Sequence, residues 1–321
     1  MPYCTVRMDL FADFCQAIRA ELKSNGFRNF SVLSDADLAI RYQGLMQRLV
    51  SDRPRRVLWS RSFTCPAEAR EGLAKLSHLF VKGENVNGHL SSSVRDLRYD
   101  DLLFNDWGIF HFHLGATYRK DGFCERTKHV LLAKITNDFV YFIDVRPHGV
   151  TNPTLWFQQD LLNVILESWP FLLESYRVRG FLSVNAVSES EHSKLRKARC
   201  NAAIQLRDGH SYFGAGGGYA LNGTSIQAVT QSDWFRDSLD KASRYILCDL
   251  SRALRLFFPG YKRWPSELRI RLLKLGGQIV VVADGSPSWM EIKPTEVVFY
   301  CLDEPEQARR ATLGLPVDAS V

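Results

Sequence analysis

Residues Asp106 to Gly115 read DWGIFHFHLG, and two further apolar runs follow them: Lys128 to Thr136 (KHVLLAKIT) and Phe139 to Val145 (FVYFIDV). All three runs are rich in aromatic or β-branched residues and alternate with a period of two, which favours β-strands. A tight Asn137-Asp138 turn joins the last two runs. The sequence therefore predicts an antiparallel meander of three strands.

Helical patterns come before the meander. Asp9 to Lys23 places apolar residues at helical spacing, and a second helix is expected from Asp35 to a stop at Pro54. After a short predicted strand, Arg56 to Phe63, a third helix should begin at Pro66, because proline is tolerated in a first helical turn. The first half is therefore predicted to carry helices and a small sheet.

The second half of the chain mixes both kinds of element. A hairpin is expected around Asp208-Gly209, then one long helix from Ser225 to Phe257, then strands at Gln278 to Ala283 and Glu296 to Leu302. Gln158 to Arg177 is helical in pattern, but Pro170 should break it. The predicted class is α+β. Two domains are expected: residues 1–180, with N-terminal helices and an antiparallel meander sheet, and residues 181–321, an α+β domain with a long central helix.

Composition limits the class of protein. The chain has 321 residues, 45% of them hydrophobic and 24% charged, an ordinary globular composition. No apolar run approaches the roughly 20 residues of a membrane helix, and the N-terminus has no pattern of a secretory signal, so a cytoplasmic protein without a membrane partner is expected. The seven cysteines never form a CxxC pair. Neither a disulfide framework nor a structural zinc site is predicted, and no cofactor is expected.

Two histidines stand out in the first strand. Residues two apart in a strand point to the same side, so Ile109, His111 and His113 should share one face. His148 follows the last strand and can return to the same neighbourhood. Such imidazoles can transfer protons near neutral pH, or bind a transition metal together with Asp144, or simply be structural side chains bonded to backbone or to Asp144. The residues alone leave all three interpretations open.

Basic residues indicate an anionic partner. The net charge is +6, and arginines concentrate between residues 41 and 61 and in the loop from Tyr118 to Lys128. A solvated surface is the alternative interpretation. The residues predicted to contact nucleic acid are Arg53, Arg55, Arg56, Arg119, Lys120 and Lys128.

Two other segments have a structural interpretation that is favoured over a functional one. Phe213 to Gly223 (FGAGGGYALNG) is predicted to be a tight connection; the alternative is an anion-binding loop formed by Gly216, Gly217 and Gly218. The charged residues from Glu189 to Arg199 are predicted to form a solvated helix.

The order of helices, DWGIFHFHLG, a basic loop, HVLLAKI and FVYFIDVRPHG resembles the small sheet of RelE-like ribonuclease toxins and their barnase, EndoU and colicin ribonuclease relatives. The resemblance covers about residues 66–175. It implies a metal-independent endoribonuclease of a bacterial toxin–antitoxin or phage-defence setting, acting on RNA and having a possible neutralising protein partner. By residue type, His111, His113, Arg126 and His148 match the catalytic histidines and arginine of that group.

The leading hypothesis is thus an RNA-cleaving hydrolase that uses histidine acid–base catalysis. The alternatives are a noncatalytic nucleic-acid-binding or assembly protein, and a metal-dependent hydrolase that uses the histidines and Asp144.

Overall fold

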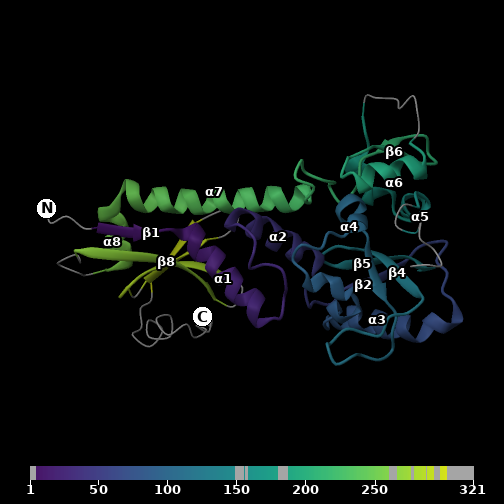
Figure 1. Cartoon of the computed structure of the whole chain (residues 1–321), viewed down its shortest axis with the longest axis horizontal. Helices are drawn as coiled ribbons and strands as arrows, with labels where there is room; N and C mark the ends of the chain where they lie inside the picture. The colour runs from purple at the N-terminus through teal and green to yellow at the C-terminus, as the bar shows by residue number, and fades with distance from the viewer. Residues whose placement is uncertain are drawn as a thin grey trace. The chain divides into compact units, whose positions relative to one another are not determined.

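The computed structural model describes residues 5–148, 155, 158–179, 187–259, 266–275, 278–286, 288–292 and 297–301. Its helices and mixed and antiparallel sheets confirm the predicted α+β class (Figure 1). The chain forms two compact units: unit 1 combines residues 1–39 and 230–321, and unit 2 is residues 40–229. The expected domain boundary near residue 180 therefore falls inside unit 2. The helices α2 (Asp35–Arg48) and α7 (Ile226–Cys248) cross the boundary between the units.

Unit 2 contains a four-stranded sheet in the order β2-β5-β4-β3. The predicted meander β3-β4-β5 is present, and its two strand pairs are antiparallel. β2 adds a fourth strand that runs parallel to β5, with Arg56 beside Phe139. The strands are β2 (Arg56–Trp59), β3 (Phe110–His113), β4 (His129–Ile135) and β5 (Phe139–Pro147), and a separate small hairpin consists of β6 (Ile204–Gln205) and β7 (Ser211–Tyr212).

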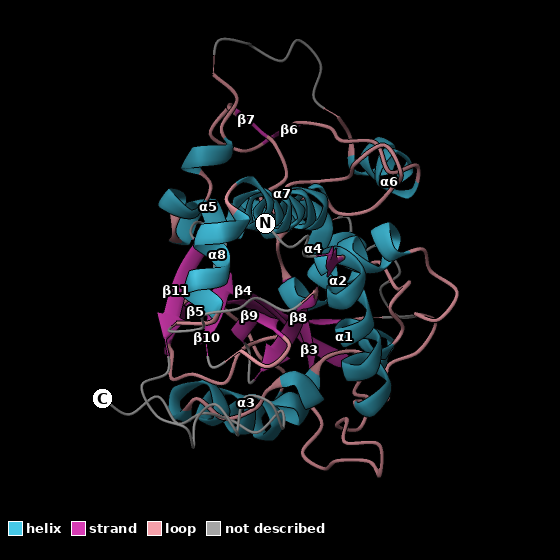
Figure 2. Ribbon diagram, turned by 90° about the vertical axis from the view of Figure 1, so that its left-hand side faces the viewer, coloured by secondary structure: helices cyan, strands magenta, loops and turns pink. Residues whose placement is uncertain are grey.

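Helices cover both faces of this sheet, with α3 on one side and α5 and α6 on the other (Figure 2). The α-helices that lie wholly within unit 2 are α3 (Arg70–Lys82), α4 (Leu102–Trp107), α5 (Asp160–Ser168) and α6 (Glu189–Lys197). Among the residues that the structure describes, its 3₁₀ helices are η1 (Ala67–Ala69), η2 (Asn87–His89), η3 (Ser92–Arg95), η6 (Pro170–Leu172) and η7 (Glu174–Tyr176).

Each face of the sheet has its own hydrophobic core. Phe110 and Phe112 of β3 pack with Phe80 of α3 and Phe142 of β5. On the other face, Trp107 and Ile109 pack with β4, β5 and α5. Alternation along β3 places His111 and His113 on this second face, beside Leu132 and Val130 of β4. All four residues of β3 are buried, so both faces of this strand are packed.

Unit 1 is built around a five-stranded sheet in the order β1-β8-β9-β10-β11. β1 pairs parallel with β8, and the other neighbours are antiparallel. The helix α1 contacts this sheet, where the Asp13 carboxylate accepts the N–H of Leu272 at 3.0 Å. The elements are β1 (Thr5–Met8), α1 (Leu10–Ser24), α8 (Leu250–Phe257), β8 (Glu267–Leu275), β9 (Gln278–Ala283), β10 (Ser288–Ile292) and β11 (Val297–Cys301).

Proline and aspartate account for where two predicted helices end. α5 stops at Ser168 before Pro170, as expected, and only 3₁₀ turns continue to Tyr176. The long helix expected up to Phe257 is instead two helices. The side chain of Asp249 accepts the N–H of Arg252 at 2.9 Å and so caps the start of α8. Within the described ranges, no helix has the length and apolar character needed to span a bilayer.

Candidate active site

A cavity of about 330 Å³ in unit 2 brings together the four residues that the sequence nominates for catalysis. His111 and His113 lie on β3, Arg126 lies in the loop between β3 and β4, and His148 directly follows β5. The size falls in the range of small-ligand pockets. The remaining wall is formed by Ser91, Ser93, Tyr99, Asp100, Asp101, Leu102 and Leu103.

The three imidazoles are neighbours. The ring centroids of His113 and His148 are 5.1 Å apart, and those of His111 and His113 are 6.4 Å apart. His148 is held against β4, because its backbone N–H donates to the carbonyl of Lys128 at 3.0 Å and its Nδ1 lies 3.2 Å from the same oxygen. The end of β5 thus lies beside the start of β4, as the predicted antiparallel meander requires.

Asp101 completes the site and was not nominated from the sequence. Its Oδ2 lies 3.3 Å from Nδ1 of His111, and its Oδ1 accepts the N–H of Phe104 at 3.0 Å as the N-cap of α4. Burial alone would raise the pKa of this carboxyl, but the charge of His111 and the capping N–H of Phe104 hold the pKa below its ordinary value. The available signal in the sequence was an aspartate directly before the apolar residues Leu102, Leu103 and Phe104, the pattern of a helix N-cap.

Neighbouring charges and burial keep two of the histidines neutral. Burial lowers the pKa of His113 to about 3, and His111, His148 and Arg126 add to the effect. Burial also lowers the pKa of His148, more strongly than the Lys128 carbonyl raises it. The free site therefore holds uncharged imidazoles at neutral pH at these two positions, next to the carboxylate of Asp101.

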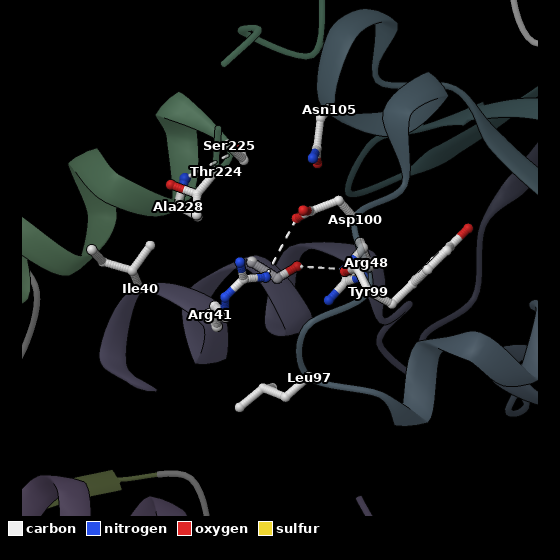
Figure 3. Close-up of a pocket in the computed structure, with 11 residues that line it drawn as sticks. Ile40, Arg41, Arg48, Leu97, Tyr99, Asp100, Asn105, Thr224, Ser225 and Ala228 are labelled. Atoms are coloured by element: carbon white, nitrogen blue, oxygen red, sulfur yellow. Dashed lines mark hydrogen bonds and ion pairs between the residues drawn. The ribbon is translucent and has the colours of Figure 1, made fainter. Parts of the chain in front are cut away.

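Arginines fix the loop that carries Asp101 (Figure 3). Arg48 donates to the carbonyl of Tyr99, and Arg41 lies 3.6 Å from the carboxylate of Asp100. Arg199 reaches the other oxygen of Asp100 at 3.0 Å. These contacts surround a small hollow of about 20 Å³ behind the loop, so Arg41 and Arg48 serve the scaffold rather than the protein surface.

The opposite wall is supported by His89, which is fully buried. Its Nδ1 lies 2.8 Å from the carbonyl of His113, and its Nε2 lies 2.9 Å from the hydroxyl of Tyr118. The ammonium of Lys75 lies 4.3 Å from the Tyr118 ring. His89 therefore fixes the end of β3, a role that its position in a polar, Ser-rich loop did not indicate.

Arg126 is the cation best placed to meet a ligand in this cavity. Its side chain is exposed, and the described part of the chain supplies it with no hydrogen bond or ion pair. Lys120 and Lys128 are also exposed, whereas Arg119 is paired with Asp121 at 2.9 Å. Among the basic residues predicted between β3 and β4, Arg126 alone lines the cavity.

The arginines at β2 are placed elsewhere. Arg56 pairs with Phe139 at the start of β5, whereas His113 pairs through Val130 with Arg146, seven residues farther along β5. Arg56 and His113 are therefore separated by about 23 Å along the strand direction. They are also separated across the sheet by three strand spacings of about 4.8 Å each. Arg53, Arg55 and Arg56 therefore do not belong to the histidine cavity.

The prediction that Arg55 contacts nucleic acid from the surface is corrected. Its guanidinium is buried and donates to the carbonyls of Thr136, Ser51 and Arg53 at 3.0, 2.9 and 3.3 Å. Burial also lowers the pKa of Arg55. Arg53 and Arg56 are exposed, and Arg53 is paired with Asp138 at 3.2 Å.

The alternative metal site lacks one of its expected ligands. The carboxylate of Asp144 accepts from the backbone N–H and hydroxyl of Thr64 at 3.1 and 2.9 Å, and pairs with Arg146 at 2.8 Å. It does not line the histidine cavity. In the part of the chain that the structure describes, no three His, Cys, Asp or Glu side chains are arranged to hold a metal ion.

The glycine cluster forms a tight connection that packs closely against α4, as the favoured structural interpretation predicted. The amides of Gly216 and Gly218 donate to the carbonyls of Asp106 and Asn105 at 2.8 and 2.9 Å. A Cβ at Gly216 would lie 2.2 Å from the carbonyl oxygen of Phe104, so only glycine fits there. These amides are used within the fold, which leaves the anion-loop alternative without its donors.

No known protein family matches this chain, and comparisons with curated proteins and with solved structures also find no match.

Proposed function

We propose that unit 2 is a metal-independent endoribonuclease and that the histidine cavity is its active site. The observation that carries the proposal is the convergence of His111, His113, His148 and Arg126 in one cavity, with His111 paired to Asp101. This set supplies proton acceptors, proton donors and a cation around a space for one nucleotide-sized group.

The reaction needs no group beyond these side chains and the RNA. One imidazole removes the proton of the ribose 2′-hydroxyl, O2′ attacks the adjacent phosphorus, and the bond from phosphorus to O5′ breaks. A second imidazole donates a proton to O5′ as it leaves. The products are a 2′,3′-cyclic phosphate and a free 5′-hydroxyl. The imidazole that accepted the 2′-hydroxyl proton ends protonated, and the imidazole that protonated O5′ ends neutral.

The environments of the imidazoles support one division of these roles. His113 is neutral in the free site and can accept the 2′-hydroxyl proton, while the negative phosphate raises the pKa of nearby imidazoles as it binds. His111 is held by Asp101, the arrangement that lets a carboxylate orient an imidazole and stabilise it while it carries a proton. Arg126 faces the charge that develops on the phosphoryl oxygens.

The test compares the full-length protein with His111→Gln and His113→Gln in an RNA-cleavage assay that contains EDTA. Glutamine keeps the size and polarity of the side chain but cannot transfer a proton. Each variant should lose about 10²-fold or more of the cleavage rate. His78→Gln is the matched control, because His78 is exposed on α3 outside the cavity.

An oligodeoxyribonucleotide of the same sequence should bind but not be cleaved, because it lacks the 2′-hydroxyl nucleophile. RNA binding with no cleavage by the wild-type protein would favour the noncatalytic alternative, and cleavage abolished by EDTA would favour a metal-dependent hydrolase. An enzyme that cleaves cellular RNA would act in the cytoplasm. The toxin or phage-defence setting and a neutralising protein partner stay predictions of the sequence resemblance.

A further inference from the structure

Unit 2 contains a second, larger cavity of about 610 Å³ that shares no lining residue with the histidine cavity. Its walls come from the end of α2, the β4–β5 turn, the 3₁₀ helices after α5 and the glycine-rich connection. The volume lies within the range of small-molecule sites. Nothing in the proposed reaction uses this cavity.

Two cationic side chains, Lys134 and Arg55, line this cavity, and the described lining residues place no carboxylate beside them. The Nζ of Lys134 donates to the carbonyl of Trp107 at 3.3 Å, and Lys134 has no ion pair within the described residues. Arg55 is bonded to backbone carbonyls, and none of the described lining residues is Asp or Glu. Burial lowers the pKa of Lys134 to about 8. Lys134 is partly buried, and an ammonium held away from water without a counter-charge is costly. An anionic ligand would supply that charge.

The amide of Gln47 lines the same cavity and is also unsatisfied. Its Oε1 and Nε2 are both buried, and neither has a hydrogen-bond partner among the described residues. Leaving a buried donor and acceptor unpaired costs free energy. The amide therefore offers an adjacent donor and acceptor, the pattern that pairs with the edge of a nucleobase.

Aromatic side chains complete the lining. The rings of Phe104 and Phe110 meet edge to face with centroids 4.7 Å apart, and Tyr176 also lines the cavity. Phe171 is 63% exposed although it is a large apolar residue. Rings of this kind provide surfaces on which a planar heterocycle can pack.

We propose that this cavity binds a small anionic ligand with a planar, hydrogen-bonding ring, of the nucleoside monophosphate class. The phosphate would lie at Lys134, the ring against the aromatic side chains, and the ring edge at the amide of Gln47. The inference does not rest on the ribonuclease proposal, because no residue is common to the two cavities.

The test is calorimetric titration of the full-length protein with the four ribonucleoside 5′-monophosphates, their nucleosides and inorganic phosphate. The variants are Lys134→Met, which removes the charge and keeps the side-chain length, and Gln47→Leu. Lys82→Met is the matched control, because Lys82 is exposed on α3. Thermal unfolding checks that each variant is folded, and Lys134→Met should be at least as stable as wild type because no buried ammonium remains.

At least one monophosphate should bind, and Lys134→Met should weaken its binding by about tenfold or more. Gln47→Leu should reduce the preference among the four bases, and Lys82→Met should change neither property. Binding should persist in His113→Gln, which separates this cavity from the histidine cavity. The proposal is overturned if no monophosphate binds at millimolar concentration, if nucleosides or phosphate alone bind as tightly, or if His113→Gln removes binding and Lys134→Met does not.

Discussion

At the residue scale, the candidate active site depends on the different surroundings of two neighbouring imidazoles, those of His111 and His113. His111 has a carboxylate 3.3 Å from its ring, whereas His113 is buried among His111, His148 and Arg126 and is kept neutral. Two titratable groups whose environments favour different protonation states are suited to opposite roles in proton transfer, one as acid and one as base. Asp101 is accordingly a positioning residue, since it acts on the reaction through His111.

Replacing Asp101 with asparagine tests this role. Asn still caps α4 but cannot stabilise a charged imidazole, so the cleavage rate should fall by about 10²-fold while RNA affinity changes little. The pH–rate profile should also shift, which loss of a merely structural contact would not produce. Asp121→Asn, at a surface pair with Arg119, is the control. An unchanged rate and pH profile would remove Asp101 from the mechanism.

The buried His113 should also make the fold sensitive to acid. An unfolded His113 takes up a proton near pH 6.5, but the folded residue does so only near pH 3. Between these values the unfolded state binds more protons, so the free energy of unfolding should fall as the pH falls, by up to about 1.4 kcal/mol per pH unit from this group. Urea unfolding at several pH values in this window should show a shallower dependence for His113→Gln, and equal slopes would contradict the assignment.

Residue identity and the strand pattern were enough to nominate three of the residues that line the site. His111 and His113 follow from the period of β3, His148 follows from the compact meander, and Arg126 was nominated through the resemblance to ribonuclease toxins. Asp101 was not predictable in the same way, because its role depends on a loop held in place by contacts distant in sequence, such as Arg48 with Tyr99. For the same reason Arg55 was misplaced on the surface.

At the scale of elements, α6 is attached to α4 by a buried polar cluster. Asp106 accepts from Nε of Arg196 at 2.8 Å, and Nε2 of His192 lies 3.0 Å from the same carboxylate oxygen. His192 stacks on Trp107, and the Arg196 guanidinium lies 4.1 Å from the Trp107 ring. The prediction of a solvated helix is therefore wrong for one face of α6, because charge alone does not reveal a buried partner ninety residues away.

Arg196→Met should destabilise unit 2 strongly. The change leaves Asp106 buried without its main counter-charge, and removal of one partner of a buried ion pair typically costs about 3–5 kcal/mol. Lys197→Met, at the exposed neighbouring position, should change the free energy of unfolding by less than about 0.5 kcal/mol. Urea denaturation measures both values. Similar values for the two variants would show that the cluster contributes little to stability.

The local sequence pattern predicted individual helices and strands better than it predicted which strands pair. The meander and the break at Pro170 depend on residues close in sequence, and both are present. β8 (ELRIRLLKL) alternates and could have been recognised as a strand, but its parallel partner β1 lies more than 250 residues away. A pairing at that separation leaves no local signal, so unit 1 and its boundaries were missed.

At the scale of the whole molecule, the two units have separate sheets and separate cores. Unit 1 closes through the pairing of β1 with β8, while unit 2 is one continuous segment with cores on both faces of its sheet. Compact units with their own cores are expected to unfold as cooperative units.

Core truncations in each unit test this organisation. Ile270 in β8 and Leu132 in β4 are both buried, and replacement by alanine typically costs about 2–5 kcal/mol. Calorimetry should show two transitions, one lowered by Ile270→Ala and the other by Leu132→Ala. A single transition that both variants lower equally would mean that the chain unfolds as one unit.

The central claim is that the ribose 2′-hydroxyl is the nucleophile in the histidine cavity, and the ends of the cleaved RNA test it most directly. Mass spectrometry of a defined oligoribonucleotide cleaved in EDTA should find a 2′,3′-cyclic phosphate on one fragment and a 5′-hydroxyl on the other, with neither formed by His111→Gln or His113→Gln. A 3′-hydroxyl with a 5′-phosphate, or an RNA left intact by the wild-type protein, would contradict the account.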